Sequence, residues 1–353
     1  MENITLIDPV NDPRWDTFVE NHPWGWIVHL SGWKTVLENC FPHMKGHYLA
    51  LVDSTSNEIR AGLPIFEVRS WLTGDRLITV PCATICDPLF VKKEDADRLL
   101  TAVLAISKTT GIHHIQIRTL NTHHLINNTF ASDKLFVHHY LPLDKEPGEI
   151  KKSFHYKAVQ YEINKAIKNK LQLKIADSES DLRCFYHLYS TTRKRLYLPA
   201  QPYQFFKSIW DVFSPSQNVM LLLALSNETV VAGHFLLLCN GRVSVEAVGW
   251  DATSKASPNH FLFWEGIKLS SSMGYKIFDF GRTSSRNESL ISFKNRWGTT
   301  VVDLPHFFYP EQDSEKALQR EISSGYKFIQ MLCKRSPDFL YPSIGRFCFR
   351  HLG

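Results

Sequence analysis

The segment "GYKIFDFGRTS", from Gly274 to Ser284, decides the fold because the chain contains a similar segment earlier. The earlier copy is "GIHHIQIRT", from Gly111 to Thr119. In both, a helical stretch ends at a glycine, the residue best suited to a left-handed helix end, and a strand then closes on Arg-Thr. Such recurrence within one chain is the first sign of a duplicated module.

A second pair of segments supports the duplication. Ser56-Asn57-Glu58 precedes Ala61-Gly62, and Ser226-Asn227-Glu228 precedes Ala232-Gly233. Each triplet stands between two apolar, strand-like runs, and each half has a further extended run, "FVHHYLPL" (136–143) or "VVDLPHFFY" (301–309). Because these matches keep their order along the chain, we predict two copies of one α/β module.

The second copy shows its elements more clearly. Apolar spacing predicts a helix over 182–197 and strands over 219–225, 230–239 and 242–250. Asn240-Gly241 favours a tight hairpin, because a type I′ turn needs positive φ at both positions. A helix then follows the polar loop "DATSKASPN" (251–259), with Asn259 as its N-cap, and a strand comes after it. This order is that of the GNAT acyltransferase fold, with a mixed, mostly antiparallel sheet flanked by helices.

The composition limits the class of protein. With 353 residues, 44% of them hydrophobic, the chain is long enough for one large domain or two medium ones. A net charge of +5 allows an anionic ligand but does not indicate a nucleic-acid-binding protein. The seven cysteines show neither paired metal-ligand spacing nor a disulfide framework. The N-terminus has no apolar signal segment and no apolar run is long enough to span a bilayer, which favours a cytoplasmic protein.

Several segments resemble the FemAB-like acyltransferases. They are "HLSGW" (29–33), "AGLPIFEVRS" (61–70), "SPNHFLFWEGI" (257–267), "GYKIFDFGRTS" (274–284) and "FKNRWGT" (293–299), and the likeness extends from about residue 13 to 310. The resemblance implies tandem GNAT modules and transfer of acyl or aminoacyl groups. The family includes enzymes that add amino acids to peptidoglycan precursors from aminoacyl-tRNA. The likeness is strongest to the branch associated with exopolysaccharide and protein-sorting gene sets.

Acyl transfer to an amine needs a base for the nucleophile and a donor for the oxyanion. Glu246 lies in the strand 242–250, which faces the acyl carbonyl in a GNAT module, and an acid among apolar neighbours there could act as the base. Asp279 and Arg282 lie at the end of the neighbouring strand, where the two strands of a GNAT module separate to form the cleft. Arg282 is predicted to bind a phosphate or carboxylate. A salt bridge from Glu246 and a buried Asp279–Arg282 pair remain the structural alternatives.

Three further candidates come from the resemblance. Phe293-Lys294 matches a Phe-Lys pair of the Fem enzymes, whose lysine is thought to stabilise developing negative charge or the end of the donor. Lys294 is therefore predicted to be catalytic, with Glu246 and Asp279. Phe293 and Trp297 are predicted to line the substrate pocket, although Trp297 could equally be a core residue and Lys294 a surface lysine.

The donor is open between aminoacyl-tRNA and acyl-CoA, with no tightly bound cofactor expected. A CoA-binding module normally has a glycine-rich loop whose backbone N–H groups hold the pyrophosphate. The matching loop, residues 251–259, contains no glycine, although its Asn259 is a candidate substrate contact. We therefore expect weak or no binding of acetyl-CoA.

Two basic stretches add candidate partners. Seven lysines against one acid lie between Lys151 and Lys174, either as a phosphate-contacting edge for aminoacyl-tRNA or as a solvated linker helix. The tail from Ser324 to Gly353 carries five lysines and arginines against Asp338, together with several aromatic residues. It either packs on the protein or makes peripheral contact with the inner face of the membrane.

Three His-His pairs, at residues 113–114, 123–124 and 138–139, do not predict a metal site. Adjacent residues of a strand point to opposite faces, and no acid-containing metal motif accompanies the pairs. No metal is therefore assigned.

These observations give a predicted organisation. Residues 1–150 form a first GNAT-like module on the acceptor side, 151–323 a second module with the chemical site, and 324–353 a basic aromatic helical tail. The predicted function is N-acyl or aminoacyl transfer to an amine of a cell-envelope or polysaccharide precursor, with a small-molecule or lipid-linked acceptor. The alternative is a non-catalytic GNAT-like module that binds a glycan or lipid-linked precursor.

Overall fold

The computed structural model describes residues 4–122, 126, 129–312 and 324–352. The chain forms two compact units, one made of Met1–Phe136, Asp303–Lys327 and Phe347–Gly353, the other of Val137–Val302 and Phe328–Arg346. The units are interleaved along the chain, whereas the sequence-based boundaries at 150 and 323 divide it into consecutive pieces. Each unit contains one mixed sheet flanked by helices, so the predicted fold class of two tandem GNAT-like modules is confirmed.

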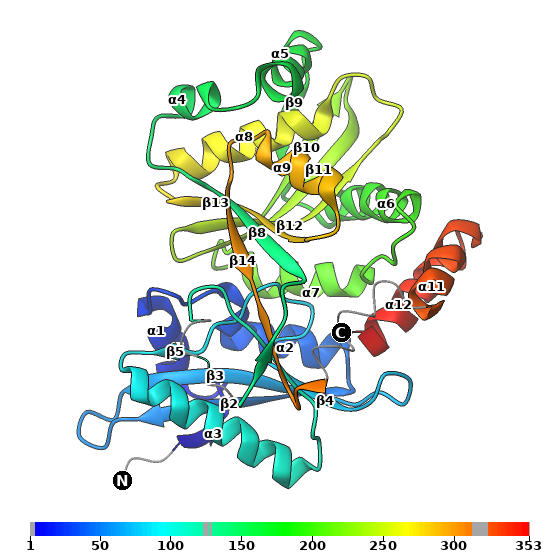
Figure 1. Cartoon of the computed structure of the whole chain (residues 1–353). Helices are drawn as coiled ribbons and strands as arrows, with labels where there is room; N and C mark the ends of the chain where they lie inside the picture. The colour runs from blue at the N-terminus through cyan, green and yellow to red at the C-terminus, as the bar shows by residue number, and fades with distance from the viewer. Residues whose placement is uncertain (1–3, 123–125, 127–128, 313–323, 353) are drawn as a thin grey trace. The chain divides into compact units, whose positions relative to one another are not determined.

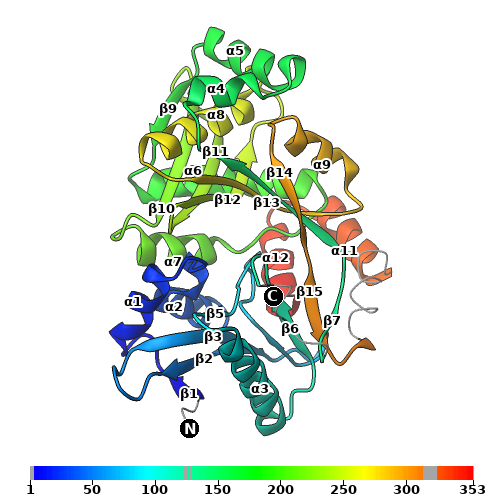
Figure 2. The ribbon, with the colours of Figure 1, turned by 60° about the vertical axis from the view of Figure 1, so that its left-hand side comes forward.

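The first unit is built on a sheet with the strand order β1-β2-β3-β4-β6-β15-β7, and β5 also pairs with β3. Its strands are β1 (Ile4–Ile7), β2 (Met44–Val52), β3 (Ile59–Val68), β4 (Arg76–Ile78), β5 (Leu89–Phe90), β6 (Ile115–Arg118), β7 (Ala131–Ser132) and β15 (His306–Tyr309). Helix α3 (Lys93–Thr110) packs Leu99 and Val103 against one face of the sheet. Helices α1 (Pro13–Asn21) and α2 (Ser31–Cys40) cover the other face, as Figure 2 shows.

The second unit is built on a sheet with the order β14-β8-β13-β12-β11-β10-β9. Its strands are β8 (Phe136–Pro142), β9 (Gln172–Ile175), β10 (Val219–Ser226), β11 (Thr229–Cys239), β12 (Arg242–Trp250), β13 (Ile277–Ser284) and β14 (Thr300–Leu304). The helices are α4 (Pro147–Lys152), α5 (Tyr161–Lys168), α6 (Glu179–Arg195), α7 (Tyr203–Phe213), α8 (Pro258–Ser272) and α9 (Glu288–Asn295). Helices α5 and α8 pack on one face of the sheet (Figure 1), and Phe185 and Phe206 of α6 and α7 pack against Phe235 on the other face.

The predicted repeat has a packing reason. In the hairpin β2–β3, Gly62 pairs with Ala50, and in the hairpin β10–β11, Gly233 pairs with Leu223. A Cβ atom on Gly62 would lie 2.6 Å from the Trp15 ring, and one on Gly233 would lie 2.8 Å from the Phe185 ring. In each module the glycine therefore makes room for an aromatic side chain of a covering helix. The predicted hairpin turn at Asn240-Gly241 is confirmed, with φ of 43° and 72°.

The last strands of the two halves are exchanged between the sheets. The run at 136–143 closes the first half in sequence, yet it supplies β8 to the second sheet, between β14 and β13. The run at 301–309 supplies β14 to the second sheet and β15 to the first, where β15 pairs with β6 from His306–Arg118 to Tyr309–Ile115. Figure 2 shows β15 between β6 and β7. This exchange is why the compact units are not consecutive along the chain.

The C-terminal segment contains α11 (Ser324–Arg335) and α12 (Tyr341–Leu352). Tyr341 is buried and donates a hydrogen bond from its hydroxyl to the carbonyl of Leu198. Gly345 packs so closely on Ala200 that a Cβ atom would lie 2.2 Å from the Ala200 carbonyl oxygen. The tail is thus packed on the protein along this side. Among the described residues, no helix combines the length and apolar character needed to cross a membrane.

Candidate active site

The candidate site lies in the second unit, where two parallel strands separate. Strands β12 and β13 pair only from Arg242–Ile277 to Ser244–Asp279, although β12 continues to Trp250 and β13 to Ser284. Beyond Ser244 and Asp279 the two backbones are no longer paired with each other. The separation predicted from the GNAT fold is therefore present, and it begins at one of the predicted site residues.

Glu246 is the extra residue of a β-bulge at this point. The pairing of β11 with β12 passes from Phe235–Ala247 directly to Leu236–Val245, so Glu246 has no partner residue on β11. Bulges redirect a side chain and are common beside active sites. Burial of the carboxyl group raises the pKa of Glu246 to about 7. The positive charge of Arg282 opposes this rise, and the negative charge of Asp279 adds to it. A carboxyl group with such a pKa can accept a proton near neutral pH.

Gln201, which sequence analysis missed, holds the Glu246 carboxyl group. Its side chain hydrogen-bonds that carboxyl group and lowers the pKa. The Gln201 Oε1 atom in turn accepts a hydrogen bond of 3.1 Å from the Tyr189 hydroxyl group, which fixes the orientation of the amide. Gln201 comes from the segment between α6 and α7, and no local motif links it to β12.

Asp279 is a buried carboxylate with partners on two strands. Its Oδ1 atom lies 3.1 Å from His138 Nε2 on β8, and its Oδ2 atom lies 3.6 Å from an Arg242 nitrogen on β12. The Gly281 N–H donates to Oδ1 at 2.6 Å. Burial alone would raise the pKa of Asp279, but the charges of His138 and Arg242 and the Gly281 hydrogen bond together lower it. Asp279 is therefore ionised and belongs to a hydrogen-bonded charge cluster.

Lys294 points into the protein beside the same strand end. Its side chain is 6% exposed, and its Nζ atom donates to the carbonyl oxygens of Gly281 at 2.9 Å and Arg282 at 3.1 Å. Burial lowers the pKa of Lys294 to about 8; Asp279 opposes this effect and Arg282 adds to it. The structure therefore brings Lys294 together with Asp279 and Arg282, and its catalytic role stays a prediction.

The two Arg-Thr copies differ in environment. Arg282 is exposed at the strand separation, and its charge acts on both Glu246 and Lys294. Arg118, its counterpart in the first unit, is buried and donates to the Ala83 carbonyl oxygen at 2.6 Å. Arg118 thus makes a structural hydrogen bond within the first unit. The exposed Arg282 is accessible to a ligand.

The predicted position of Asn259 needs correction. Helix α8 begins at Pro258, so its N-cap is Ser257, and Asn259 lies within the first turn rather than before it. The proline fixes the helix start because its backbone φ and its missing N–H suit the first helical position. The Asn259 side chain instead contacts the buried His234, with Oδ1 2.7 Å from Nε2. Burial lowers the pKa of His234 to about 4, so this ring is neutral.

Phe293 and Trp297 belong to an aromatic cluster rather than to an open surface. Trp297 is 0% exposed, and its ring contacts those of Phe154, His260, Phe263 and Phe280. Phe293 packs against the same cluster. Phe293 thus anchors α9 on the cluster that contains Trp297, and substrate contact by either side chain stays a prediction.

The pair His138-His139 was assigned no role in the sequence, yet both residues border the site. Both are buried because β8 lies between β14 and β13. His139 Nδ1 lies 3.3 Å from Thr299 Oγ1, and burial together with the Lys294 charge lowers the pKa of His139 to about 4. Among the residues that the structure describes, no three His, Cys, Asp or Glu side chains are grouped to hold a metal ion. The pair at 123–124 lies outside the described residues.

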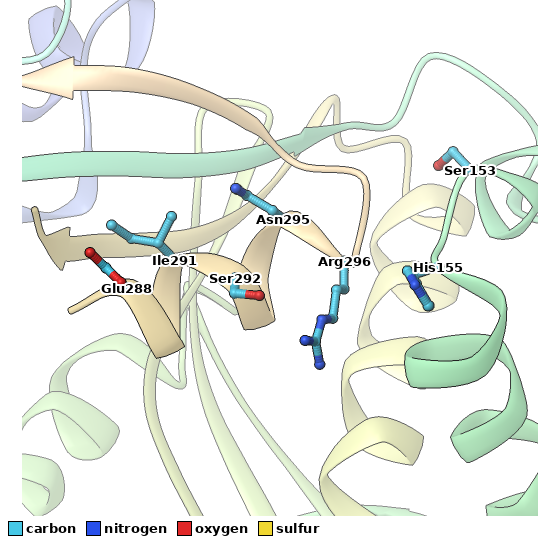
Figure 3. Close-up of a pocket in the computed structure, with 7 residues that line it drawn as sticks. All are labelled: Ser153, His155, Glu288, Ile291, Ser292, Asn295 and Arg296. Carbon is cyan, nitrogen blue, oxygen red and sulfur yellow. The ribbon is translucent and has the colours of Figure 1, made fainter.

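A pocket of about 520 Å³ opens beside α9 in the second unit. It is lined by Ser153, His155, Glu288, Ile291, Ser292, Asn295 and Arg296. Figure 3 shows Arg296 and His155 on two sides of this hollow. The lining residues of α9 recur every three or four positions, whereas Lys294 points to β13 from another side of that helix. The pocket and the strand separation are therefore neighbours across α9.

The loop before α8 uses its backbone amides internally. The Thr253 N–H and hydroxyl groups both donate to Asp251 Oδ1, at 2.8 and 2.7 Å. The Ser257 hydroxyl group donates to the Glu162 carboxylate close to the start of α8. In a CoA-binding module the backbone N–H groups of the matching loop hold the pyrophosphate, whereas here the Thr253 N–H group and the Ser257 hydroxyl group are bonded to carboxylates.

Comparisons with known proteins agree with this geometry. Residues 153–291 match a family model described as an acetyltransferase (GNAT) domain. The structure of FemX has a TM-score of 0.70 and 16% sequence identity, and the alignment covers 91% of this chain and 99% of FemX. The C-terminal domain of a proposed lysylphosphatidylglycerol synthetase from Agrobacterium fabrum has a TM-score of 0.57 and 13% identity, with 87% and 94% covered. A comparison with curated protein sequences gave no match.

A third solved structure extends the likeness to the tandem arrangement. The tandem GNAT protein from the clavulanic acid biosynthesis pathway has a TM-score of 0.53 and 9% identity, and 87% of this chain and 98% of that protein are covered. At these identities the solved structures show the shared fold. Together with the matched GNAT domain, they confirm the predicted resemblance to FemAB-like proteins. Residues 153–291 therefore form a GNAT-type acyltransferase domain, within a chain that shares the tandem fold of FemX.

Proposed function

We propose that the protein transfers an aminoacyl group to an amine of a cell-envelope or polysaccharide precursor. The observation that carries this proposal is the position of Glu246, a carboxyl group with a pKa of about 7, at the bulge where β12 leaves β13. A base whose pKa is close to neutral pH, placed where the strands of a GNAT sheet separate, can deprotonate an amine nucleophile. The fold is shared with FemX and with the C-terminal domain of a proposed lysylphosphatidylglycerol synthetase. This likeness supports an aminoacyl donor and an envelope acceptor.

The residues of the site then take distinct roles. The acceptor amine attacks the carbonyl carbon of the donor, a C–N bond forms, and Glu246 takes the proton that the nitrogen loses. The C–O bond to the donor breaks, and the leaving hydroxyl group receives a proton from Glu246 or water. Lys294 gives two of its three N–H groups to backbone carbonyls, which leaves one for the negative charge that develops on the reacting carbonyl.

The loop before α8 favours a donor other than CoA. Asp251 and Glu162 bring two negative charges to this loop, whereas a pyrophosphate is bound by N–H groups and positive charge. Arg296 and His155 instead offer cationic or hydrogen-bonding groups in the pocket beside α9. We propose that this pocket receives the polyanionic end of the donor, which in aminoacyl-tRNA is the 3′ terminus.

The acceptor is proposed to be a small amine-bearing or lipid-linked envelope precursor. Arg282, exposed at the strand separation, has the forked guanidinium group that suits a carboxylate or phosphate of such an acceptor. An enzyme with this role would work at the inner face of the membrane.

A transfer assay tests the proposal. The protein is mixed with total tRNA charged with radiolabelled amino acids and with a nucleotide-linked amino-sugar peptide, and in a parallel reaction with labelled acetyl-CoA. We expect label to pass to the acceptor from tRNA, and Glu246→Gln to lower the rate about 100-fold or more. Glu228→Gln, at an exposed hairpin turn, is the matched control and should keep the wild-type rate. Transfer that survives in Glu246→Gln, or that proceeds only from acetyl-CoA, would contradict the proposal.

A further inference from the structure

Helix α11 carries apolar and basic side chains together on its outward face. Cys333 marks the inward side, since it is buried. Phe328 and Met331, on the opposite side of the helix, are 55% and 41% exposed, and Leu332 on one flank is 37% exposed. Arg335 is exposed on this outward side, and Lys334 is exposed on the other flank of the helix. A helix packed on its own protein normally turns its large apolar side chains inward, so the exposure of Phe328, Met331 and Leu332 departs from the usual amphipathic pattern.

The same surface continues beyond the helix. Phe339, in the turn after α11, is 78% exposed, and the adjacent Leu340 is 47% exposed. Lys334 Nζ lies 4.8 Å from the centre of the Tyr197 ring, and Tyr197 is itself 41% exposed. We call Phe328, Met331, Leu332, Lys334, Arg335 and Phe339 the basic–apolar surface.

This surface is exposed although the segment is firmly packed. Tyr341 donates to the Leu198 carbonyl oxygen, and Gly345 is in close contact with Ala200. Asp338, the acid of the tail, pairs with Lys194, so its charge is compensated within the protein. The apolar side chains therefore face outward from an anchored scaffold, and the net charge around them is positive.

We propose that the basic–apolar surface docks the protein on an anionic lipid surface. Aromatic and aliphatic side chains of an interfacial helix enter the boundary between head groups and acyl chains, while lysine and arginine contact anionic head groups. A nucleic acid would make use of Lys334 and Arg335, but Met331 and Leu332 offer it neither stacking nor hydrogen bonds. The exposed apolar side chains of the surface therefore favour a lipid over a nucleic acid as its partner. This inference goes beyond the proposed function, because the chemistry in the β12–β13 separation does not depend on it.

Vesicle sedimentation tests the docking. The full chain is mixed with vesicles of phosphatidylcholine alone or of phosphatidylcholine with about one third phosphatidylglycerol. We expect binding to the anionic vesicles, little binding to the neutral ones, and weaker binding at high salt because exposed charges are screened. The double variant Phe328→Ser/Phe339→Ser should lower the partition coefficient about tenfold or more. Lys334→Glu/Arg335→Glu should abolish the preference for anionic lipid.

A matched control separates docking from folding and from catalysis. Val91→Ser removes an apolar side chain that is 73% exposed in the first unit, and it should leave binding unchanged. All variants should keep the wild-type thermal midpoint, and Phe328→Ser/Phe339→Ser should keep the transfer rate with water-soluble substrates. The proposal is overturned if wild-type protein ignores anionic vesicles, if Val91→Ser loses binding equally, or if single-stranded RNA but not lipid binds this surface.

Discussion

Asp279 and Lys294 both hydrogen-bond to the backbone of Gly281, Asp279 to its N–H group and Lys294 to its carbonyl oxygen. The Asp279 Oδ1 atom accepts the Gly281 N–H at 2.6 Å, and Lys294 Nζ donates to the Gly281 carbonyl oxygen at 2.9 Å. Gly281 has a φ of +73°, which side-chain-bearing residues rarely adopt, and it lies just beyond the last β12–β13 pair. The acid and the lysine of the candidate site thus fix the backbone at the point where the strands separate.

Replacement of Lys294 by methionine should reduce both activity and stability. If the ammonium group stabilises charge that develops in the transition state, kcat and kcat/KM should fall together by about 100-fold. The variant also leaves the carbonyl groups of Gly281 and Arg282 without their donor, which costs about 1–3 kcal/mol in free energy of unfolding. Below pH 8 the removal of a buried charge offsets part of this cost, so the loss of stability should be largest above pH 8. Urea denaturation and steady-state kinetics measure the two effects. Normal turnover in a destabilised protein would assign Lys294 a purely structural role.

Lys294 should also leave a signature in the pH dependence of stability. Its pKa is about 8 in the folded protein, below the ordinary value of 10.5, so the unfolded chain binds more protons between these pH values. The free energy of unfolding should therefore contain a contribution that rises with pH from about 8 to 10.5. Lys294→Met should lack this contribution. An identical pH profile in wild type and variant would contradict the buried position of the ammonium group.

Asp279→Asn should destabilise the second unit strongly. The substitution removes the negative partner of His138 and Arg242 in a site where the Asp279 side chain is 3% exposed. Breaking a buried ion pair from one side typically costs about 3–5 kcal/mol. Because the pKa of Asp279 is lowered on folding, its stabilising contribution is present above pH 3.8 and is lost as the pH falls through the folded value. Asp211→Asn, in an exposed pair with Lys207, is the control and should change stability by at most about 1 kcal/mol.

Acetyl-CoA should bind weakly or not at all. The glycine-free loop before α8 donates its Thr253 N–H to Asp251, and Ser257 engages the Glu162 carboxylate. An incoming pyrophosphate would meet these two negative charges. Isothermal titration calorimetry with acetyl-CoA checks this directly, and tight stoichiometric binding would refute the assignment of a different donor.

The elements of the second module could be predicted because their signals are local. Strand alternation and the Asn240-Gly241 turn predicted β10 to β12, which the structure places at Val219–Ser226, Thr229–Cys239 and Arg242–Trp250. The repeat was visible because Gly62 and Gly233 each accommodate an aromatic ring, a constraint that leaves the same small residues in both copies. Asp279 and Arg282 were predicted from their place at one strand end, and Lys294 from the resemblance of Phe293-Lys294 to the Fem enzymes.

The remaining features depend on contacts between distant residues. No pattern within "FVHHYLPL" indicates that β8 joins the second sheet, and His138 meets Asp279 only through that exchange. The bulge at Glu246 could not be predicted, because the sequence around it alternates as in a regular strand, with Val245 and Ala247 on either side. Gln201 likewise reaches Glu246 from a loop. Only the N-cap of α8 had a local signal that was overlooked, since Pro258 marks the first helical position.

Gln201→Leu should shift the pH dependence of catalysis without abolishing it. The hydrogen bond from Gln201 lowers the pKa of Glu246, so its loss should move that pKa above about 7. The rise of kcat/KM with pH should then occur at higher pH, while the rate at alkaline pH should approach that of wild type. A uniform loss of rate at every pH would instead indicate that Gln201 only supports the fold.

The most direct test of the central claim is the pH profile of kcat/KM for label transfer, in wild type and in Glu246→Gln. If Glu246 is the base, the wild-type kcat/KM should rise with pH and level off above about 7, because the group must lose its proton to act. In Glu246→Gln this limb should disappear and the plateau should fall about 100-fold or more. A wild-type profile without a step near pH 7, or the same step in Glu246→Gln, would contradict the assignment of the active site to the separation of β12 and β13.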